Sequence, residues 1–292
     1  MKIISFDIEE WYITKTIHGD SKEIFLKYDQ MLENILDALD QNGCKATFFC
    51  VGKMAEEFPE VIKKIDVKGH EIGCHSNLHT WLNKMSVEEC KEDTRAAVDS
   101  LEQCIGKKIK SYRAPAFSIG KENAWAFEIL AECGIERDSS VYPATRDFGG
   151  FPDFGVNDVA VVERNGISIK EFPIAMTSIL GKDMAYSGGG YFRFFPLWYI
   201  RRQMRKANYS IGYFHIEDLL VERNKPMSRE EYEDYFKEPG TFFARHKRHI
   251  KANLGKKSAW PKLCKLLQSK DYLNLEQADG MIDWGNIPHI KL

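Results

Sequence analysis

Short apolar runs alternate with longer amphipathic segments through the first half of the chain. Four of these runs have the length and composition of buried strands, at residues 2–6, 45–51, 70–74 and 109–114. Apolar side chains at helical spacing predict helices over residues 24–39, 61–65, 87–101 and 125–133. Ser86 and Glu89 form a capping box before the third of these helices. The alternation predicts a parallel sheet covered by helices, either as a barrel or as a doubly wound sheet.

The pattern becomes less regular after residue 140. Residues 141–166 are rich in Gly, Pro, Asp and Phe, and the sequence predicts one hairpin there, between 159–163 and 167–172. Further along, it predicts a loop at 187–190, a helix at 196–207 and a strand at 210–216. From residue 240 onward the composition shifts again, toward Lys and Arg.

Ionisable side chains follow the predicted strands at the points where those strands end. Asp7 and Glu9 end the first strand and, two residues apart on an extended segment, point to one side. His75 and His79 follow the third strand, where one helical turn would place them on one face. Three more strand ends carry Arg113, Asp138 and His215. Carboxyl ends of parallel strands meet at one edge, which is where active sites lie in such sheets.

This set of residue types is typical of a metal-dependent hydrolase. Two histidines and a carboxylate leave coordination positions open, which suits Zn²⁺, Co²⁺, Ni²⁺ or Fe²⁺. A second carboxylate would serve as general base, a further histidine as general acid, and an arginine would hold the base ionised. Each residue also has an ordinary structural alternative, such as a helix cap, an ion pair or a satisfied core histidine. Their joint position at strand ends favours the catalytic interpretation.

Composition and charge indicate which partners and which cell compartment to expect. The 292 residues carry 41 Lys+Arg and 43 Asp+Glu, so a net charge of -2 gives no reason to expect nucleic-acid binding. Apolar runs fall far short of the roughly 18 residues of a membrane helix, and an acid at position 7 interrupts any signal-peptide pattern. The seven cysteines are irregularly spaced, as expected of reduced thiols. We therefore expect a cytoplasmic protein.

Five ordered motifs resemble those of the polysaccharide deacetylase family, also called the NodB-homology or carbohydrate esterase family 4 hydrolases. Residues 5–9 resemble the first motif, and His75-Ser76-Asn77-Leu78-His79 matches H-[ST]-x-x-H. Residues 113–116 match R-x-P-[YF] in part, residues 138–140 stand where the fourth motif belongs, and residues 213–216 resemble the last. The resemblance implies a distorted, incomplete (β/α) barrel, similar to a TIM barrel.

The resemblance also implies a role for each matched residue. Asp7 would be the general base, and His75 and His79 would be metal ligands. Arg113 would orient Asp7. His215 would be the general acid, and Asp138 would tune it. The implied cofactor is a divalent metal, Zn²⁺ first and Co²⁺, Ni²⁺ or Fe²⁺ otherwise.

Two positions depart from the family pattern. The second Asp of the first motif, usually a metal ligand, is Ile8, which cannot coordinate. Glu9 is its expected replacement, and the alternatives are Asp7 as ligand or a site without metal. Ala116 stands where an aromatic residue is common, which would widen the pocket.

Residues 187–193 and the C-terminal part resemble the family members encoded with exopolysaccharide and capsule genes. Tyr191 and Arg193 are candidates for contacts to sugar or phosphate, the alternative being a turn with a surface ion pair. Trp81 is a candidate for stacking on a sugar ring, the alternative being simple packing. The resemblance implies a catalytic domain at residues 1–225 and a basic, mostly helical extension at 226–292 packed on it.

The expected reaction removes an acetyl group from an N-acetylated sugar in bacterial surface-polysaccharide biosynthesis. The substrate would be a polysaccharide or a lipid-linked or nucleotide-linked precursor. An allantoinase-like hydrolase of small amides and an inactive sugar-binding protein remain alternatives. Residues 240–270 hold nine Lys+Arg and no acid. They are expected either to pack on an acidic body or to contact an anionic lipid or a phosphorylated carrier.

Overall fold

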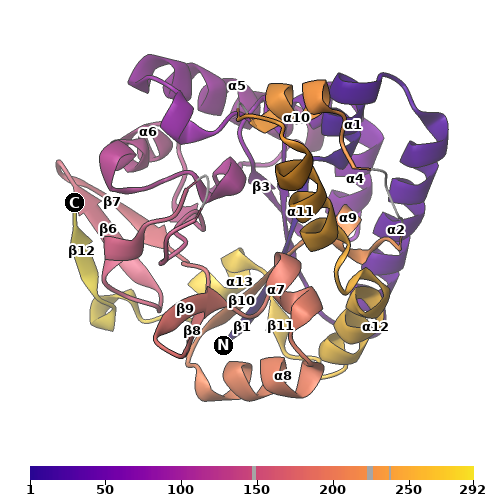
Figure 1. Ribbon diagram of the computed structural model, residues 1–292. Coiled ribbons are helices and arrows are strands. Elements are labelled where there is room, and N and C mark those ends of the chain that lie inside the picture. Colours follow the sequence, from indigo (N-terminus) through magenta and orange to yellow (C-terminus); the bar gives the residue numbers. More distant parts are fainter. Residues whose placement is uncertain (147–148, 222–225, 237) are drawn as a thin grey trace.

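Parallel strands form the centre of the molecule, and helices cover their outer side (Figure 1). The structure is a computed structural model, and it describes residues 1–146, 149–221, 226–236 and 238–292. The strands of the main sheet lie in the order β10-β1-β2-β3-β4-β5-β7-β6-β12, with β11 paired to β1. Their bounds are β1 Lys2–Ile8, β2 Thr47–Cys50, β3 Glu71–Cys74, β4 Ser111–Tyr112, β5 Arg137–Asp138, β6 Ala160–Arg164, β7 Ile167–Glu171, β10 Ser210–His215, β11 Tyr272–Leu273 and β12 His289–Lys291.

The sheet curves into an open barrel, as the sequence motifs imply. Strands β10 through β5 and β7 run parallel, β6 returns antiparallel to β7, and β12 pairs parallel with β6. Among the described strands, the outermost two, β10 and β12, are not hydrogen-bonded to each other. The barrel is therefore incomplete and leaves room for a cleft. A separate hairpin, β8 Met176–Ile179 and β9 Lys182–Ala185, extends from it.

The helices form where apolar residues repeat at helical spacing. The long helix α2 buries six apolar side chains against the sheet: Tyr28, Met31, Leu32, Ile35, Leu36 and Leu39. The capping box at Ser86 and Glu89 begins α5, as predicted. The helix bounds are α1 Glu10–His18, α2 Lys22–Gln41, α3 Gly52–Glu57, α4 Pro59–Val67, α5 Val87–Ile105, α6 Ala126–Glu132, α7 Gly189–Phe194, α8 Leu197–Lys206, α9 Ile216–Leu219, α10 Arg229–Phe236, α11 Phe242–Asn253, α12 Lys256–Leu267 and α13 Leu275–Asp279.

Some local predictions were wrong. The predicted loop at 187–190 contains the start of α7, whose first residues are glycines that give no sequence signal for a helix. The hairpin at 159–172 is confirmed, but the β8–β9 hairpin was not predicted. Among the described residues, no helix is both long enough and apolar enough to cross a bilayer.

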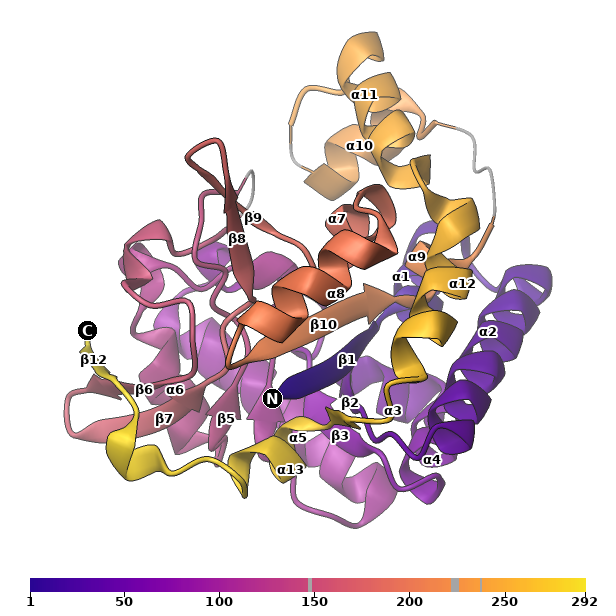
Figure 2. The ribbon, with the colours of Figure 1, turned by 90° about the horizontal axis from the view of Figure 1, so that it is seen from below.

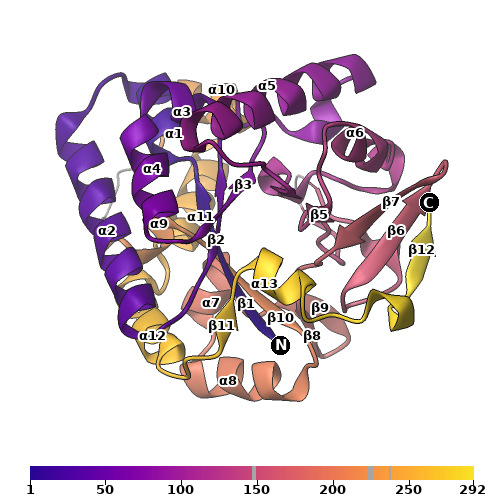
Figure 3. The same ribbon diagram turned by 180° about the vertical axis from the view of Figure 1, so that it is seen from behind.

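Residues 226–292 lie on both ends of the barrel. Helices α10 and α11 stand over the end where α7 lies, at the carboxyl ends of the strands (Figure 2). Strand β11 and helix α13 lie on the opposite end (Figure 3), where β11 pairs with β1. The C-terminal residues therefore contribute both to the main sheet and to the end of the barrel that carries the site.

Candidate active site

The first strand delivers two carboxylates to the open end of the barrel. Asp7 is almost fully buried, and the parallel register of β1 with β10 places it beside His215. Glu9 follows at the start of α1, where its carboxylate meets two histidines. Because Asp7 and Glu9 are two residues apart on a nearly extended segment, both reach the same cleft.

The two histidines come from a loop and not from the predicted helical turn. Ser76 and His79 both have left-handed backbone angles, with φ of 60° and 56°. These angles fold the segment back on itself after β3, so that the rings of His75 and His79 lie with centroids 5.3 Å apart. The prediction that the two rings lie together is confirmed, although the backbone conformation that brings them together differs.

The described residues contain one group that fits a metal ion, namely Glu9, His75 and His79, whose ligand atoms lie within 4.8 Å of one another. Oε2 of Glu9 is 3.2 Å from Nε2 of His75 and 2.7 Å from Nε2 of His79. Nδ1 of His75 lies 2.7 Å from the carbonyl oxygen of Arg113. A carbonyl only accepts, so Nδ1 donates this hydrogen bond, which fixes the ring and directs Nε2 toward Glu9.

The pKa of Glu9 is consistent with a ligand role. Burial alone would raise this pKa, but the neighbouring His79, His215 and His75 outweigh burial and hold it well below the usual value. Glu9 is therefore ionised and able to coordinate a cation. Two imidazoles and one carboxylate form the donor set that suits Zn²⁺ and related divalent metals.

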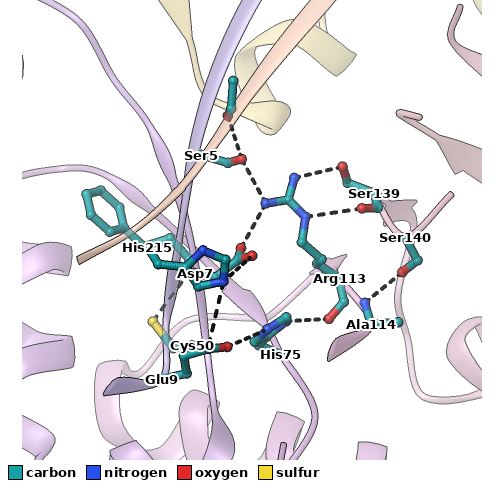
Figure 4. Close-up of polar contacts among 12 residues, drawn as sticks. Ser5, Asp7, Glu9, Cys50, His75, Arg113, Ala114, Ser139, Ser140 and His215 are labelled. Atoms are coloured by element: carbon teal, nitrogen blue, oxygen red, sulfur yellow. Dashed lines mark hydrogen bonds and ion pairs between the residues drawn. The ribbon is translucent and has the colours of Figure 1, made fainter. Parts of the chain in front are cut away.

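Arg113 is a fully buried cation that fixes the position of Asp7 (Figure 4). Its NH1 group is 2.8 Å from Oδ1 of Asp7 and donates to the hydroxyl of Ser5. The other guanidinium nitrogens donate to the carbonyl and hydroxyl oxygens of Ser139, and the group lies 4.2 Å from the centre of the Phe49 ring. All three nitrogens are thus satisfied, and the ion pair fixes the orientation of Asp7.

His215, the last residue of β10, lies next to the carboxylates of Asp7 and Glu9. Its Nε2 is 3.7 Å from Oδ2 of Asp7 and 3.6 Å from Oε1 of Glu9. Its Nδ1 is 3.2 Å from Oδ2 of Asp218. Desolvation would lower the pKa of His215, but Glu9, Asp218 and Asp7 together raise it well above its ordinary value. The imidazole is therefore protonated and can act as an acid.

Asp218 takes the place that the sequence motif implied for Asp138. The buried carboxylate of Asp138 bonds to the backbone and hydroxyl of Ser140 and faces Glu171, behind the site. Burial and the Asp138 charge raise the pKa of Glu171 well above its ordinary value, so Glu171 holds a proton. Asp138 therefore supports the strand ends, and the carboxylate that contacts His215 comes from α9. The i,i+3 spacing from His215 is the sequence signal that could have found Asp218.

Arg193 forms a buried ion pair at the edge of the cleft. Its NH1 group is 3.0 Å from Oδ1 of Asp218 and 2.8 Å from the carbonyl oxygen of Ala252. It borders the cleft, but its guanidinium is engaged by Asp218 and by α11. The ion pair agrees with the alternative expected for Arg193, although it is buried and positions Asp218, and a contact to substrate stays a prediction.

A cleft of about 920 Å³ is lined by Asp7, Glu9, His75, His79, Arg193, His215 and Asp218. Trp81 and Tyr191 lie in its wall, so both are placed where a sugar could contact them. The cleft is also lined by Arg146 and Tyr235, which the sequence did not single out, by Tyr213 of the last motif, and by Lys247, Arg248 and Lys251 of the basic segment. Three of these belong to α11, which covers one side of the cleft mouth.

The fold and the donor set define an open (β/α)-barrel protein with a candidate site for one divalent metal. The polysaccharide deacetylase family model matches residues 17–137, and the model of a domain of unknown function, DUF3473, matches residues 139–279. The first match includes His75, His79 and Arg113, whereas Asp7 and Glu9 precede it. A protein from Mycobacterium smegmatis that is named a polysaccharide deacetylase has a similar fold, with a TM-score of 0.63. The two sequences are 16% identical, and the match covers 100% of this chain and 92% of that one.

Two curated relatives of this chain are also named as deacetylases. A peptidoglycan-N-acetylglucosamine deacetylase of Bacillus cereus is 34% identical over 112 residues, 36% of this chain and 41% of that protein. A chitooligosaccharide deacetylase of Azorhizobium caulinodans is 30% identical over 97 residues, 33% of this chain and 43% of that protein. The chain thus spans less than half the length of these two relatives. The family model and these two relatives thus show similarity to polysaccharide deacetylases over part of the chain.

Proposed function

We propose that this chain is a metal-dependent deacetylase that hydrolyses the amide bond of an N-acetylated sugar. The observation that carries the proposal is the placement of Asp7 and His215 within one cleft, directly beside the donor set of Glu9, His75 and His79. Arg113 holds the side chain of Asp7, and Asp218 holds the imidazole of His215. The site therefore offers a base and an acid as two neighbouring groups.

Glu9, His75 and His79 would hold the cation, with zinc expected first. When bound, the cation would supply Lewis-acid chemistry at the amide carbonyl. Asp7 is the base that accepts a proton from the attacking water, and Arg113 holds it in position. The new C–O bond forms, the C–N bond breaks, and His215 gives its proton to the departing nitrogen. The products are acetate and an amino sugar.

We propose a glycan of N-acetylated hexosamines as the substrate class. Relatives named for action on peptidoglycan and chitooligosaccharide support this choice. Trp81 and Tyr191, in the wall of the cleft, offer aromatic faces for a sugar ring. The resemblance of residues 187–193 to proteins encoded with exopolysaccharide and capsule genes supports a precursor or polymer of surface polysaccharide.

A histidine substitution tests the mechanism. His75→Ala should lose bound metal and acetate release together, because it removes one of three donors; we expect a drop of at least about 100-fold in kcat/KM. Metal content is measured by mass spectrometry and acetate by an enzyme-linked assay on N-acetylchitooligosaccharides. His18→Ala, at an exposed histidine, is the matched control. Full activity of the metal-stripped His75→Ala protein would contradict the proposal.

The same assay separates the alternative functions. Opening of a ureide ring without acetate release would indicate an allantoinase-like amidase. Sugar binding by the metal-loaded wild-type protein, with neither reaction, would indicate an inactive binding protein.

A further inference from the structure

Helix α11 exposes large apolar side chains beside the mouth of the cleft. Every side chain of this helix, all of which the structure describes, is half-buried or exposed. Phe242, Phe243 and Ile250 expose 69%, 76% and 64% of their surface, and Leu254, which follows the helix, exposes 53%. A helix in a soluble protein ordinarily turns such residues toward a core, so this one presents its apolar side to something outside the barrel.

The apolar residues lie on one side of the helix and the lysines border them. At 100° per residue, Phe242, Ile250, Phe243 and Leu254 span about 120° of the helix circumference. Lys247 and Lys251 follow directly on the next part of the surface, and both are exposed. This arrangement, apolar residues flanked by long cationic side chains, is that of a helix lying in a membrane interface.

A second protrusion carries an apolar tip on the same side of the molecule. Leu180, at the turn between β8 and β9, is 100% exposed. Figure 2 shows the β8–β9 hairpin and α11 rising from the same end of the barrel, α11 above α7 and the hairpin to the left of α7. Met184 of β9 and Phe243 of α11 both line the cleft, so the two protrusions flank its mouth.

The distribution of charged residues along the chain indicates what kind of surface α11 would contact. Residues 240–270 contain nine Lys+Arg and no acid, and the remaining residues therefore hold 32 basic against 43 acidic side chains. The cationic part of the chain is thus the part that bears the exposed apolar face. An anionic bilayer satisfies both features, because its headgroups attract lysines and its acyl region accepts Phe, Ile and Leu side chains.

We propose that α11 and the β8–β9 tip dock the protein on an anionic lipid surface, with the mouth of the cleft facing the bilayer. A lipid surface is favoured over a protein partner because the apolar residues sit on two separate protrusions, which both reach a flat bilayer. This inference extends the proposed function by naming what the cleft mouth faces. The vesicle assay below contains no sugar, so the two proposals fail separately.

Vesicle sedimentation with the full chain tests the docking. We expect binding to vesicles with about 30% phosphatidylglycerol at about 0.1 M salt, much weaker binding to pure phosphatidylcholine, and release near 1 M salt. The triple variant Leu180→Ser, Phe242→Ser, Ile250→Ser should bind at least about 10-fold more weakly. None of these three residues lines the cleft, so its activity on a soluble N-acetylchitooligosaccharide should stay unchanged.

Matched variants separate specific docking from general adhesion. Leu26→Ser, Val67→Ser, Met281→Ser removes three exposed apolar side chains elsewhere and should bind like the wild type. Lys247→Glu, Lys251→Glu should lose binding, whereas Lys22→Glu, Lys63→Glu, at exposed sites on α2 and α4, should not. Equal losses in each matched pair would overturn the proposal. The proposal would also be overturned if the wild-type chain bound to none of the vesicles and formed a dimer through α11.

Discussion

Three side chains from three elements contact one another in series and position His215, the proposed acid of the site. His215 ends β10, Asp218 lies in α9, and Arg193 comes from α7. Asp218 contacts both of the others, at 3.2 Å and 3.0 Å. Its pKa is lowered because His215 and Arg193 outweigh the effect of burial. A carboxylate held in this way orients the imidazole and supports its positive charge.

Asp218→Asn should therefore lower kcat for acetate release by about 100-fold while KM changes little, because the amide keeps the shape but loses the charge. Asp138→Asn is the comparison, since Asp138 lies behind the site and contacts Ser140. Steady-state kinetics on N-acetylchitooligosaccharides measures both. An Asp218→Asn protein with a wild-type kcat would show that His215 needs no charged partner.

His70 gives a prediction about stability. It is buried, with its Nδ1 accepting from the backbone of Ala46, and desolvation followed by the charge of Lys45 lowers its pKa to about 4 from 6.5. The folded state thus resists protonation, so stability is full above about pH 6.5 and falls as pH drops toward 4, by up to about 3 kcal/mol. His70→Asn should flatten this part of the pH–stability curve in urea unfolding.

The comparison for this experiment is His18→Asn, which changes an exposed histidine. It should leave the slope between pH 6.5 and pH 4 as in the wild type. Identical slopes for His70→Asn and the wild type would mean that other groups cause the loss of stability in acid.

At the scale of elements, α12 holds α7 in place. The ammonium of Lys262 lies 2.7 Å, 2.8 Å and 3.1 Å from the carbonyl oxygens of Phe192, Arg193 and Phe195. The last carbonyl groups of a helix have no hydrogen-bond partners within that helix. At this short helix, one cation from another helix supplies the missing donors. Because Arg193 lies in this segment, α12 also positions the residue that holds Asp218.

Lys262→Ala should cost about 2 kcal/mol of folding free energy, because it leaves partly buried carbonyl oxygens without a donor. It should also lower kcat through looser placement of Arg193. Lys265→Ala, at an exposed lysine of the same helix, should change neither. Urea unfolding and acetate-release kinetics report the two effects, and equal stability of both variants would contradict the proposed role of Lys262.

On the scale of the whole molecule, the C-terminal residues help to build the sheet. Strand β11 pairs with β1 and β12 pairs with β6, and the backbone of Leu275 donates to the hydroxyl of Thr47 on β2. Asp279 forms ion pairs with Arg137 and Lys170, on β5 and β7. The division into residues 1–225 and 226–292 stays a prediction, and these contacts bear on whether the two parts fold separately.

A chain that ends at residue 225 should not unfold as a cooperative unit with native stability. It would expose the edge of β6 and one side of Lys2 and Ile3 at the start of β1, and it would leave Arg137 without Asp279. Circular dichroism during urea unfolding measures this against the full chain. A sharp transition at the same midpoint would show that residues 1–225 form an independent domain.

The sequence pattern by itself predicted a parallel sheet covered by helices, and the resemblance of its motifs implied the open barrel that the structure has. Most of the predicted site residues line the cleft. Strand ends are readable because apolar runs stop where Asp7, His75 and Arg113 begin, and parallel pairing brings such ends to one edge. Glu9 was also readable, since its spacing from Asp7 fixes its side of the strand. These features follow from local pattern and from the geometry that every parallel sheet shares.

Only the tertiary structure decided which carboxylate contacts His215 and where the basic segment lies. Asp138 ends β5 and Asp218 follows β10. Their different surroundings depend on strand pairing, because β5 pairs with β7 and this pairing places Asp138 beside Glu171. The basic residues 240–270 have a helical pattern, but their position over the cleft follows from the packing of α11 and α12 on α7. Contacts between residues distant in sequence are set by packing, which local pattern does not encode.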